Sequence, residues 1–246
     1  MNMIQVFKSL GPIDAKNVRR DSLLNWMMLI PVISALVIRW GLPPLTRGIL
    51  TRYGFDLTPY YPVIMSYFFV LMTPLLFGVV IGMLLLDERD DRTLSALQVT
   101  PLSLNNYLVY RIATPMVLSI LLMFVIYPIT NVGILNLSSL LIAAIVAAPI
   151  APIFALALAS VAENKVQGFA LMKASGALLM PPIFAFFVQS QWEMAFGLFP
   201  SYWPIKVYWM LEAGQPGVWL YALIGLAYQG ILLTLLLRRF NKIMHQ

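Results

Sequence analysis

The densest group of side chains that could do chemistry lies in residues 87–103, which read DERDDRTLSALQVTPLS. Carboxylates in this stretch could hold a hard divalent cation, because Mg²⁺ and Ca²⁺ prefer oxygen ligands. These carboxylates are Asp87, Glu88, Asp90 and Asp91. Membrane prenyl and phosphatidyl transferases use two separated acidic motifs for this purpose, and the sequence has no second acidic cluster. Two arginines in the same stretch neutralise part of its charge, so we expect no metal site here.

Other catalytic chemistries also lack the residues they need. An acidic pair could serve an intramembrane protease, but that chemistry needs partner histidines to activate water, and His245 is the only histidine. The chain has no cysteine, which excludes a thiolate nucleophile and a cysteine-ligated metal. It also lacks the glycine-rich phosphate loop of an ATPase. We therefore expect no catalytic residue and no cofactor in this chain.

Two non-catalytic interpretations of residues 87–103 remain. The segment could be a solvated, charged loop that merely stops the preceding apolar segment from slipping. It could instead form a short amphipathic helix from Asp91 to near Pro101, because Leu94, Leu97 and Pro101 are spaced along one helical stripe. A helix this short cannot fold alone, so it would have to dock on another surface.

The elements that must position this segment are apolar enough to lie in a membrane. The chain is 61% hydrophobic and 11% charged, whereas a soluble domain carries about 25% charged residues. Six segments reach the roughly 20 mostly apolar residues that a spanning helix needs. They are residues 23–40, 62–86, 107–132, 137–161, 168–188 and 218–237. We therefore predict an all-α integral membrane protein with six transmembrane helices in a single domain, residues 1–246.

Lysine and arginine residues give the orientation of these spans. If both ends lie in the cytoplasm, 12 of the 16 lysines and arginines fall in the inner segments and four in the outer ones. Cytoplasmic segments carry such an excess, so we predict that both ends and residues 87–103 lie in the cytoplasm. Residues 1–22 would form an interfacial helix. The net charge of +6 is then a topology signal, and no nucleic-acid recognition module is visible.

The connection before the last span, residues 189–217, contains seven aromatic residues and three prolines. It could form an aromatic belt at the membrane surface, where amphipathic rings are favoured. We favour two short re-entrant or interfacial helices, because residues 206–212 are helix-competent between helix breakers. In that arrangement Phe199, Trp203 and Trp209 would form an outer gate.

Few charges lie within the predicted spans, which argues against a proton or sodium relay. Several polar residues could line a substrate pathway, although each could instead hydrogen-bond to a neighbouring helix. These candidates are Asn25, Thr73, Thr114, Ser175 and Gln229. A mostly apolar pathway would suit a hydrophobic or amphipathic substrate.

Residues 87–103 resemble the signature of ABC-2 type transporter permeases, the membrane subunits of ATP-binding-cassette exporters. In that family the second span leads into an acidic and basic pair, then Thr-Leu, an apolar residue, Thr/Ser-Pro and a small polar residue. The matching residues are Glu88 with Arg89, Thr93 with Leu94, Leu97, Thr100 with Pro101, and Ser103. Ser95 departs from the pattern, since the family often has an acidic residue there. Asp90 and Asp91 depart as well, since a small residue is common at that point.

The resemblance covers nearly the whole chain. The residues that lead into the first span are similar to the family's interfacial helix, namely Lys16, Arg19, Arg20 and Asp21. The aromatic pairs Phe199-Pro200 and Trp203-Pro204 resemble those of permeases for drug or fluoroquinolone export. By this likeness the fold is that of a type V exporter, with a cytoplasmic coupling helix after the second span and short outer helices before the sixth.

The resemblance implies a non-catalytic permease subunit that moves a drug-like, lipid or natural-product compound out of the cytoplasm. Two permease chains, identical or paralogous, would join two ATPase subunits in a bacterial inner membrane, and the ATPases would hold ATP and Mg²⁺. The residues implied to couple the chain to the ATPase are Glu88, Arg89, Arg92, Thr93, Leu94, Leu97, Val99, Thr100, Pro101 and Ser103. Three of these, Glu88, Arg89 and Arg92, would form a polar network with the interfacial helix. The alternative is an ion- or proton-coupled carrier or channel, which should show intramembrane carboxylates or an inverted repeat.

Overall fold

The computed structural model describes residues 3–90, 104–188 and 190–244, and there is no strand among them. Five helical segments of this part are long and apolar enough to cross a membrane: Ser22–Tyr53, Thr58–Asp90, Asn106–Thr130, Leu137–Val161 and Val218–Lys242. They coincide with five of the six predicted spans, so the chain is an all-helical, multi-pass membrane protein. Most of the predicted coupling segment, residues 91–103, lies outside the described residues.

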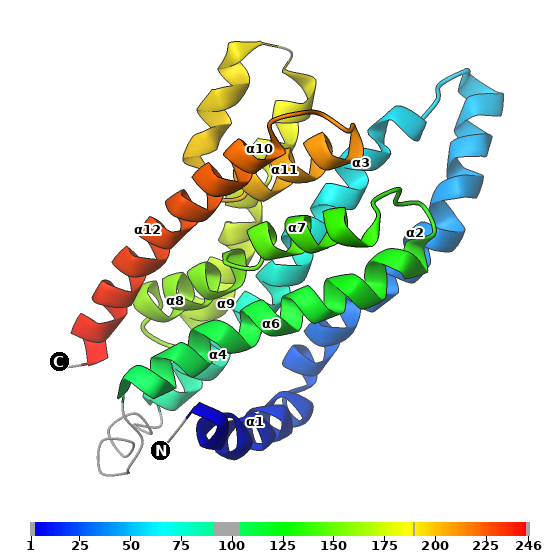
Figure 1. Cartoon of the computed structure of the whole chain (residues 1–246). Coiled ribbons are helices and arrows are strands. Elements are labelled where there is room, and N and C mark those ends of the chain that lie inside the picture. Colours follow the sequence, from blue (N-terminus) through cyan, green and yellow to red (C-terminus); the bar gives the residue numbers. More distant parts are fainter. Residues whose placement is uncertain (1–2, 91–103, 189, 245–246) are drawn as a thin grey trace.

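The helices pack side by side in one bundle (Figure 1). They are α1 Met3–Arg20, α2 Ser22–Tyr53, η1 Thr58–Tyr60, α3 Tyr61–Met65, η2 Ser66–Leu71, α4 Met72–Asp90, α6 Leu104–Thr130, α7 Leu137–Ala147, α8 Ile150–Val161, α9 Lys165–Leu179, α10 Pro181–Phe184, η3 Ala185–Phe187, η4 Gln191–Leu198, α11 Tyr202–Glu212 and α12 Val218–Met244. Helix α1, the end of α4, the start of α6 and the end of α12 lie at one end of the bundle, which we call the base (Figure 1). Helices α3 and α11 lie toward the opposite end.

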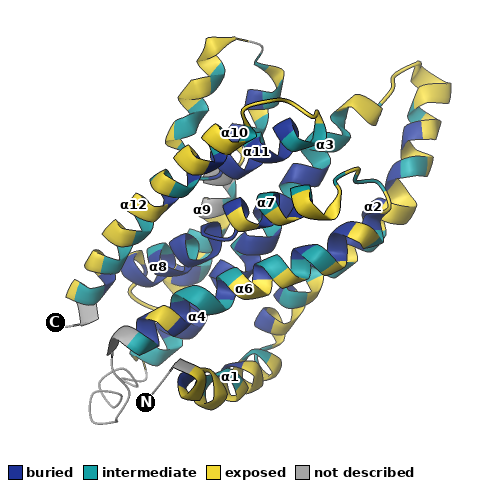
Figure 2. Ribbon diagram, in the orientation of Figure 1, coloured by how far each residue is buried: buried dark blue, intermediate teal, exposed yellow. Residues whose placement is uncertain are grey.

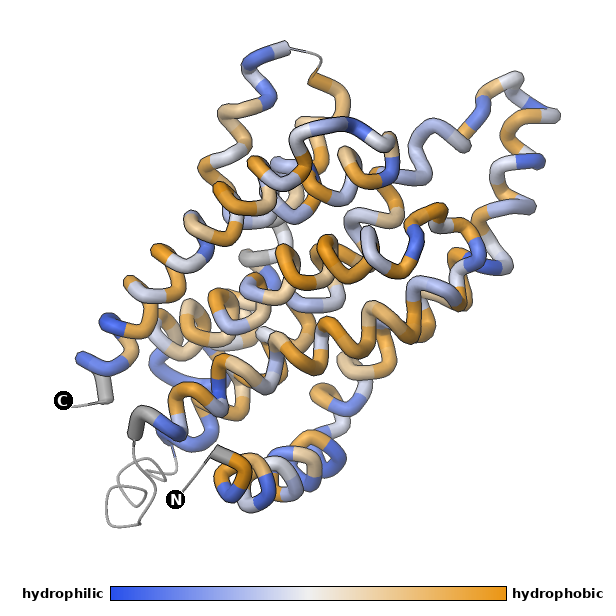
Figure 3. The backbone as a smooth tube through the Cα atoms, in the orientation of Figure 1, coloured by the Kyte–Doolittle hydropathy of each residue, from blue (hydrophilic) through white to orange (hydrophobic). Residues whose placement is uncertain are grey.

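Helix α4 forms the centre of the bundle. Of the most apolar stretch of Thr58–Asp90, 89% is buried, against 28% for Ser22–Tyr53 and 17% for Val218–Lys242. The helices around α4 carry exposed apolar side chains on their outward faces (Figures 2 and 3), for example Trp26, Leu121 and Leu223. Apolar surface this extensive is unfavourable in water, and it suits contact with lipid.

Small residues allow α4 and α8 to pack with their backbones in contact. A β-carbon added to Gly78 would lie 2.4 Å from the carbonyl oxygen of Ala151, and one added to Gly82 would lie 3.2 Å from the Cα of Ala155. Gly78 and Gly82 are four residues apart on α4, and Ala151 and Ala155 are four residues apart on α8, so the members of each pair share one helix face. This pattern of small residues is typical of close membrane-helix pairs, and it makes α4 and α8 one tightly packed unit.

The first half of the second span is an irregular helix. Helix α3 gives way to a π-helix, η2, before α4 begins. Pro74 explains the change, because it has no N–H to donate to the carbonyl of Val70. The helix widens there to a pattern of i to i+5 hydrogen bonds, and the hydroxyl of Thr73 donates to the carbonyl of Phe68 at 3.3 Å.

The fifth predicted span, residues 168–188, is not one continuous helix. It divides into α9, α10 and η3, because Pro181 and Pro182 lack the N–H groups that would continue α9. None of these pieces is among the five candidate spans of the described residues. A sixth crossing of the membrane therefore stays a prediction.

The first span is longer than the predicted residues 23–40. Helix α2 continues through Pro43 and Pro44 to Tyr53, and it ends at Gly54, whose φ of 67° forms a left-handed cap. The predicted span ended at residue 40 and so left out the last part of this helix. Neighbouring groups can satisfy the backbone carbonyls that a proline leaves free, so helices continue through such positions.

Residues 191–212 form two short helices, η4 and α11. Helix α11 is mostly buried, and Trp203, Tyr208 and Trp209 lie inside the bundle. The indole N–H of Trp203 donates to the carbonyl of Gly197 at 3.0 Å, which joins the two helices. The α11 aromatic residues are therefore part of the core and do not form a belt on its surface.

Candidate functional site

A buried arginine at the base joins three helices. The side chain of Arg111, on α6, is 1% exposed, and its Nη1 lies 2.7 Å from Oδ2 of Asp14 on α1. Its Nη2 pairs with Oε1 of Glu88 in the last turn of α4. A buried guanidinium needs partners for its charge, and its planar fork can serve two carboxylates at once. Arg111 therefore ties the amino-terminal helix to the end of the second span.

Two tyrosines of α6 complete this cluster. The hydroxyl of Tyr110 donates to Oδ2 of Asp14 at 2.7 Å, and the hydroxyl of Tyr107 donates to Glu88. The guanidinium carbon of Arg111 lies 5.3 Å from the ring centre of Tyr107 and 5.4 Å from that of Tyr110, which is within cation–π range. Residues 107, 110 and 111 share one helix face because of their i, i+3 and i+4 spacing.

A second cluster connects α9 with α2 and α4. Lys165 Nζ lies 3.1 Å from Oδ2 of Asp21 and 3.0 Å from Oδ2 of Asp87. Asp21 is also the N-cap of α2 and accepts hydrogen bonds from the amides of Leu23 and Leu24 at 3.0 and 3.2 Å. Such a cap anchors the start of the helix. One lysine thus connects the start of α2 with the end of α4.

The charges of this second cluster stabilise one another. Burial alone would raise the pKa of Asp21, but the hydrogen bonds from Leu24 and Lys165 outweigh it and hold that pKa below its ordinary value. Burial would lower the pKa of Lys165, but the hydrogen bonds to Asp87 and Asp21 hold that pKa above its ordinary value. Both groups are therefore charged at neutral pH.

Arg89 makes the third polar connection between the end of α4 and a neighbouring helix. Its Nη1 donates to the carbonyl of Ala159 at 3.1 Å and its Nη2 to the carbonyl of Ala162 at 2.6 Å. These carbonyls belong to the last turn of α8 and its C-cap, where helices leave acceptors unpaired and favour a positive charge. Asp87, Glu88 and Arg89 thus bind different neighbours: Asp87 joins α9, Glu88 joins α6, and Arg89 joins α8.

The sequence anticipated part of this site. Glu88, Arg89 and Asp21 do take part in polar ties at the base, whereas Lys16, Arg19 and Arg20 are exposed on α1. Sequence reasoning missed the other contributors, which are Asp14, Asp87, Tyr107, Tyr110, Arg111 and Lys165. The remaining predicted coupling residues, Arg92 to Ser103, lie outside the described residues. A charge near the start of an apolar span was the available signal, because such a charge must find a partner.

The predicted pathway residues have varied surroundings. Thr73 is buried and bonded within its own helix, and Nε2 of buried Gln229 donates to the carbonyl of Val146 at 3.2 Å, which joins α12 to α7. Asn25 is exposed and Thr114 is half-buried. Ser175 lies on α9, and its side chain is outside the described set.

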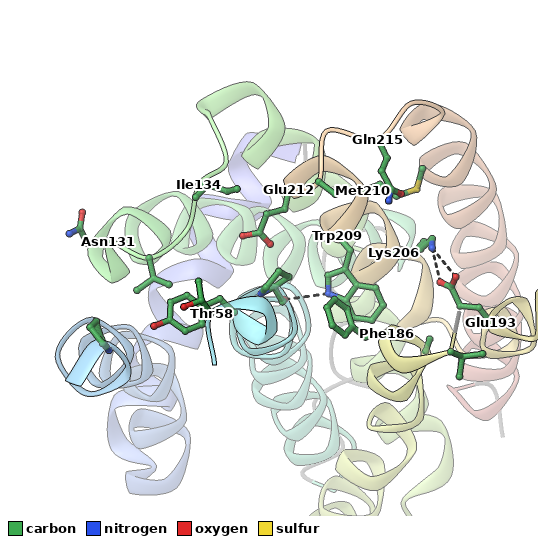
Figure 4. Close-up of a pocket in the computed structure, with 17 residues that line it drawn as sticks. Thr58, Asn131, Ile134, Phe186, Glu193, Lys206, Trp209, Met210, Glu212 and Gln215 are labelled. Atoms are coloured by element: carbon green, nitrogen blue, oxygen red, sulfur yellow. Dashed lines mark hydrogen bonds and ion pairs between the residues drawn. The ribbon is translucent and has the colours of Figure 1, made fainter. Parts of the chain in front are cut away.

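The predicted outer gate borders a cavity of about 860 Å³ at the end of the bundle away from the base (Figure 4). Trp209 lines it, and its indole N–H donates to Oγ of Ser66 at 3.0 Å. Trp203 is buried and Phe199 is half-buried, and neither of them is among the residues that line the cavity. Lys206 and Glu193, which also line the cavity, form an ion pair at 2.7 Å.

Residues 14–237 match the family model described as "Fluoroquinolones export permease protein Rv2686c-like". The chain belongs to this permease family. It is 36% identical to the fluoroquinolones export permease proteins Rv2686c and MT2760 of two Mycobacterium tuberculosis strains, over 236 residues that cover 94% of this chain and 92% of each relative. No solved structure matches the chain significantly. The permease is thus an export-type membrane transport protein, and the buried ties at its base lie within the matched region.

Proposed function

We propose that this permease is the membrane subunit of an ABC exporter, which moves an amphipathic, drug-like compound out of a bacterial cytoplasm. Its curated relatives are named for fluoroquinolone export, which supports this class of substrate. The chain has no phosphate-binding loop of its own, so the energy would come from separate ATPase subunits that bind ATP and Mg²⁺. The observation that carries the proposal is the end of α4, where three consecutive residues bind three different neighbours.

The end of α4 is suited to receive a mechanical input. The residues that follow it, 91–103, carry the resemblance to a coupling helix, so an ATPase that binds them would pull on or push α4 directly. Glu88 would pass that displacement to α6 and α1, Asp87 to α9, and Arg89 to α8. The close packing of Gly78 and Gly82 against α8 would make α4 and α8 move together.

The ATPase can drive transport only through differential binding. A conformational equilibrium shifts by the difference in affinity for its two states. Closure of the ATPases on ATP must therefore favour one arrangement of the ties at the base over the other. Buried ion pairs suit this role, since an arrangement that separates one partner from the other leaves an uncompensated buried charge, which is strongly unfavourable.

Topology and stoichiometry complete the proposal. The base would face the cytoplasm, in line with the excess of lysine and arginine in the predicted inner segments. Residues 168–188 would make the sixth crossing as a broken helix that includes most of α9, α10 and η3. Two permease chains would then surround the pathway, with one ATPase bound beneath each. Phe199, Trp203 and Trp209 would close the pathway at the outer end.

Co-purification and coupling test the proposal together. The tagged permease, expressed from its own genetic context and extracted in mild detergent, should bring down an ABC ATPase in equal amount. In proteoliposomes, an amphipathic drug should stimulate ATP hydrolysis. The variant Glu88→Gln should still bring down the ATPase but lose most of the stimulation. Glu163→Gln, which changes an exposed carboxylate, is the control and should retain it. Export that needs an ion gradient and no ATPase would refute the proposal.

A further inference from the structure

The cavity at the end away from the base is large enough for a drug-sized molecule. Its volume of about 860 Å³ lies within the range of roughly 300–1,000 Å³ typical of small-molecule sites. Its walls come from several elements: α3, the turn between α6 and α7, the segment after α10, and α11. Such a site would be built by parts of the chain that are far apart in sequence, and their relative positions would set its shape.

The two carboxylates in this cavity differ in their partners. Glu193 pairs with Lys206 at 2.7 Å and accepts a hydrogen bond from the hydroxyl of Tyr202 at 3.1 Å. Glu212 has a buried Oε2 atom with no hydrogen-bond partner in the described part of the chain. Figure 4 shows its carboxylate directed into the cavity, away from the pair of Lys206 and Glu193. Glu212 as a whole is half-buried, but a charged oxygen that is shielded from water without a cation is costly, so a positively charged guest would relieve that cost.

The electrostatic state of Glu212 agrees with this geometry. Burial raises the pKa of Glu212 to about 7, and the neighbouring Tyr208 offsets this only in part. A carboxylate in such surroundings changes its charge near neutral pH. A bound cation would favour the ionised form, so cation binding and ionisation of Glu212 would reinforce each other.

Aromatic rings supply the second half of a cation site. Tyr61, Phe186 and Trp209 all line the cavity, and the rings of Phe186 and Trp209 meet edge to face with centroids 5.1 Å apart. The indole of Trp209 is fixed by hydrogen bonds to Ser66 and to the carbonyl of Pro62. Organic cations are attracted to the faces of such rings, and a fixed ring loses little entropy when a ligand binds.

We propose that this cavity binds the positively charged group of an amphipathic organic substrate, with Glu212 as its counter-ion and Trp209, Phe186 and Tyr61 around its apolar part. The proposal rests on the export function and narrows its substrate class to amphipathic cations. Lys206 does not repel such a ligand strongly, because Glu193 neutralises it.

Binding of two ions with the same shape and opposite charge tests this directly. The full-length permease in lipid nanodiscs should bind tetraphenylphosphonium more tightly than tetraphenylborate at about pH 8. Glu212→Gln should weaken binding of the cation at least about tenfold, which corresponds to about 1.4 kcal/mol, because the neutral amide cannot serve as a counter-ion. Glu163→Gln, the same change on an exposed residue at the base, should leave binding unchanged. Equal binding of the two ions, or unchanged affinity in Glu212→Gln, would overturn the inference.

A pH series on the unmodified chain provides a test that needs no substitution. Affinity for the cation should fall as the pH drops from about 8 to about 6, because Glu212 becomes protonated. Other titratable groups that line the cavity or interact with Glu212 are Lys206 and Tyr208 on α11, Tyr127 on α6, Tyr61 on α3 and Glu193 on η4. Burial raises the pKa of Tyr208 above its ordinary value, so its hydroxyl stays neutral over this interval. Affinity that does not change with pH would contradict the role of Glu212.

The binding assay contains no ATP and no ATPase. A chain that binds the cation but brings down no ATPase would therefore refute the export mechanism and leave the site intact. A chain that couples to its ATPase but binds both ions equally would refute the site alone.

Discussion

Removal of the buried arginine at the base should destabilise the permease, and removal of its carboxylate partners as well should restore most of the loss. In the intact protein Arg111 faces two carboxylates, Asp14 and Glu88, so the cluster carries one net negative charge. Arg111→Met leaves two negative charges close together with no cation. Loss of one partner from a buried ion pair costs about 3–5 kcal/mol.

The exposures of the three side chains adjust that magnitude. Arg111 is 1% exposed, but Asp14 is 12% and Glu88 19% exposed, so water still reaches the carboxylates and the lower limit of about 3 kcal/mol applies. For a chain of this size that corresponds to a fall of about 6–12 °C in the melting temperature. The triple variant Arg111→Met, Asp14→Asn, Glu88→Gln removes all three charges, so its melting temperature should lie well above that of the single variant.

Thermal unfolding in mild detergent, followed by tryptophan fluorescence, gives both values. The non-additivity between the single, double and triple variants measures the coupling between the residues. Asp14→Asn with Glu88→Gln, but with Arg111 intact, completes the cycle and should also be destabilised, because it leaves the guanidinium buried and unpaired. A triple variant no more stable than Arg111→Met would refute the electrostatic account of this cluster and leave only a packing role for the arginine.

Three further predictions concern the rest of the base and the packing above it. Gly78→Val should cost at least about 1–3 kcal/mol through overpacking against α8, whereas Gly48→Val, where a β-carbon meets nothing within 4 Å, should not show that loss in the same unfolding assay. Arg89→Ala should expose the end of α8, seen as faster hydrogen exchange of its last turn, while exchange at the start of α2 stays unchanged. The bridge between Asp21 and Lys165 should depend on pH with a definite sign. Because the pKa of Asp21 is lowered, its carboxylate stabilises the fold above about pH 3.8, and this stabilisation is lost as the pH falls through the lowered pKa. Because the pKa of Lys165 is raised, its ammonium group stabilises the fold below about pH 10.5, and this stabilisation is lost as the pH rises through the raised pKa. The destabilisation by Asp21→Asn, up to about 1 kcal/mol, should therefore vanish at very low and at very high pH.

Hydropathy located the spans that are uniform along their length, because a long apolar run can satisfy its backbone in lipid only as a helix. It placed the end of the first span at residue 40, whereas α2 continues through Pro43 and Pro44 to Tyr53. It also joined α9 to α10, where Pro181 and Pro182 do cause a break. The same residue type has opposite outcomes at these two places, since only the surrounding packing decides whether the freed carbonyls find other partners.

The polar ties at the base were only partly predictable. The position of Glu88 and Arg89 directly after an apolar run indicated a polar network there. Their partners could not be identified, because Arg111 also fits the simple account of a positive charge near the cytoplasmic surface. Asp14 is the only acidic residue of α1, which was a usable signal for an ion pair. The partner of a charge is a property of the tertiary fold, and the spacing along one helix does not contain it.

The ties at the base and the cavity at the other end share one continuous segment, Thr58–Asp90. Its last residues bind α6, α8 and α9, and through Arg111 they are also connected to α1. Its first residues hold Trp209 through Ser66 and the carbonyl of Pro62. Between them lie a stretch packed tightly on α8 and the π-helix η2, where the wider backbone pattern leaves the helix least regular. A displacement of α4 would therefore move the tightly packed half as a unit and be absorbed at η2, close to the cavity.

In the exporter proposed here, ATP-driven movement at the base would change the position of Trp209 relative to Glu212. It would thereby change the affinity for a cation between them. The converse follows from thermodynamic reciprocity: a cation that binds at Glu212 must change the ATPase-bound equilibrium at the base by the same free energy.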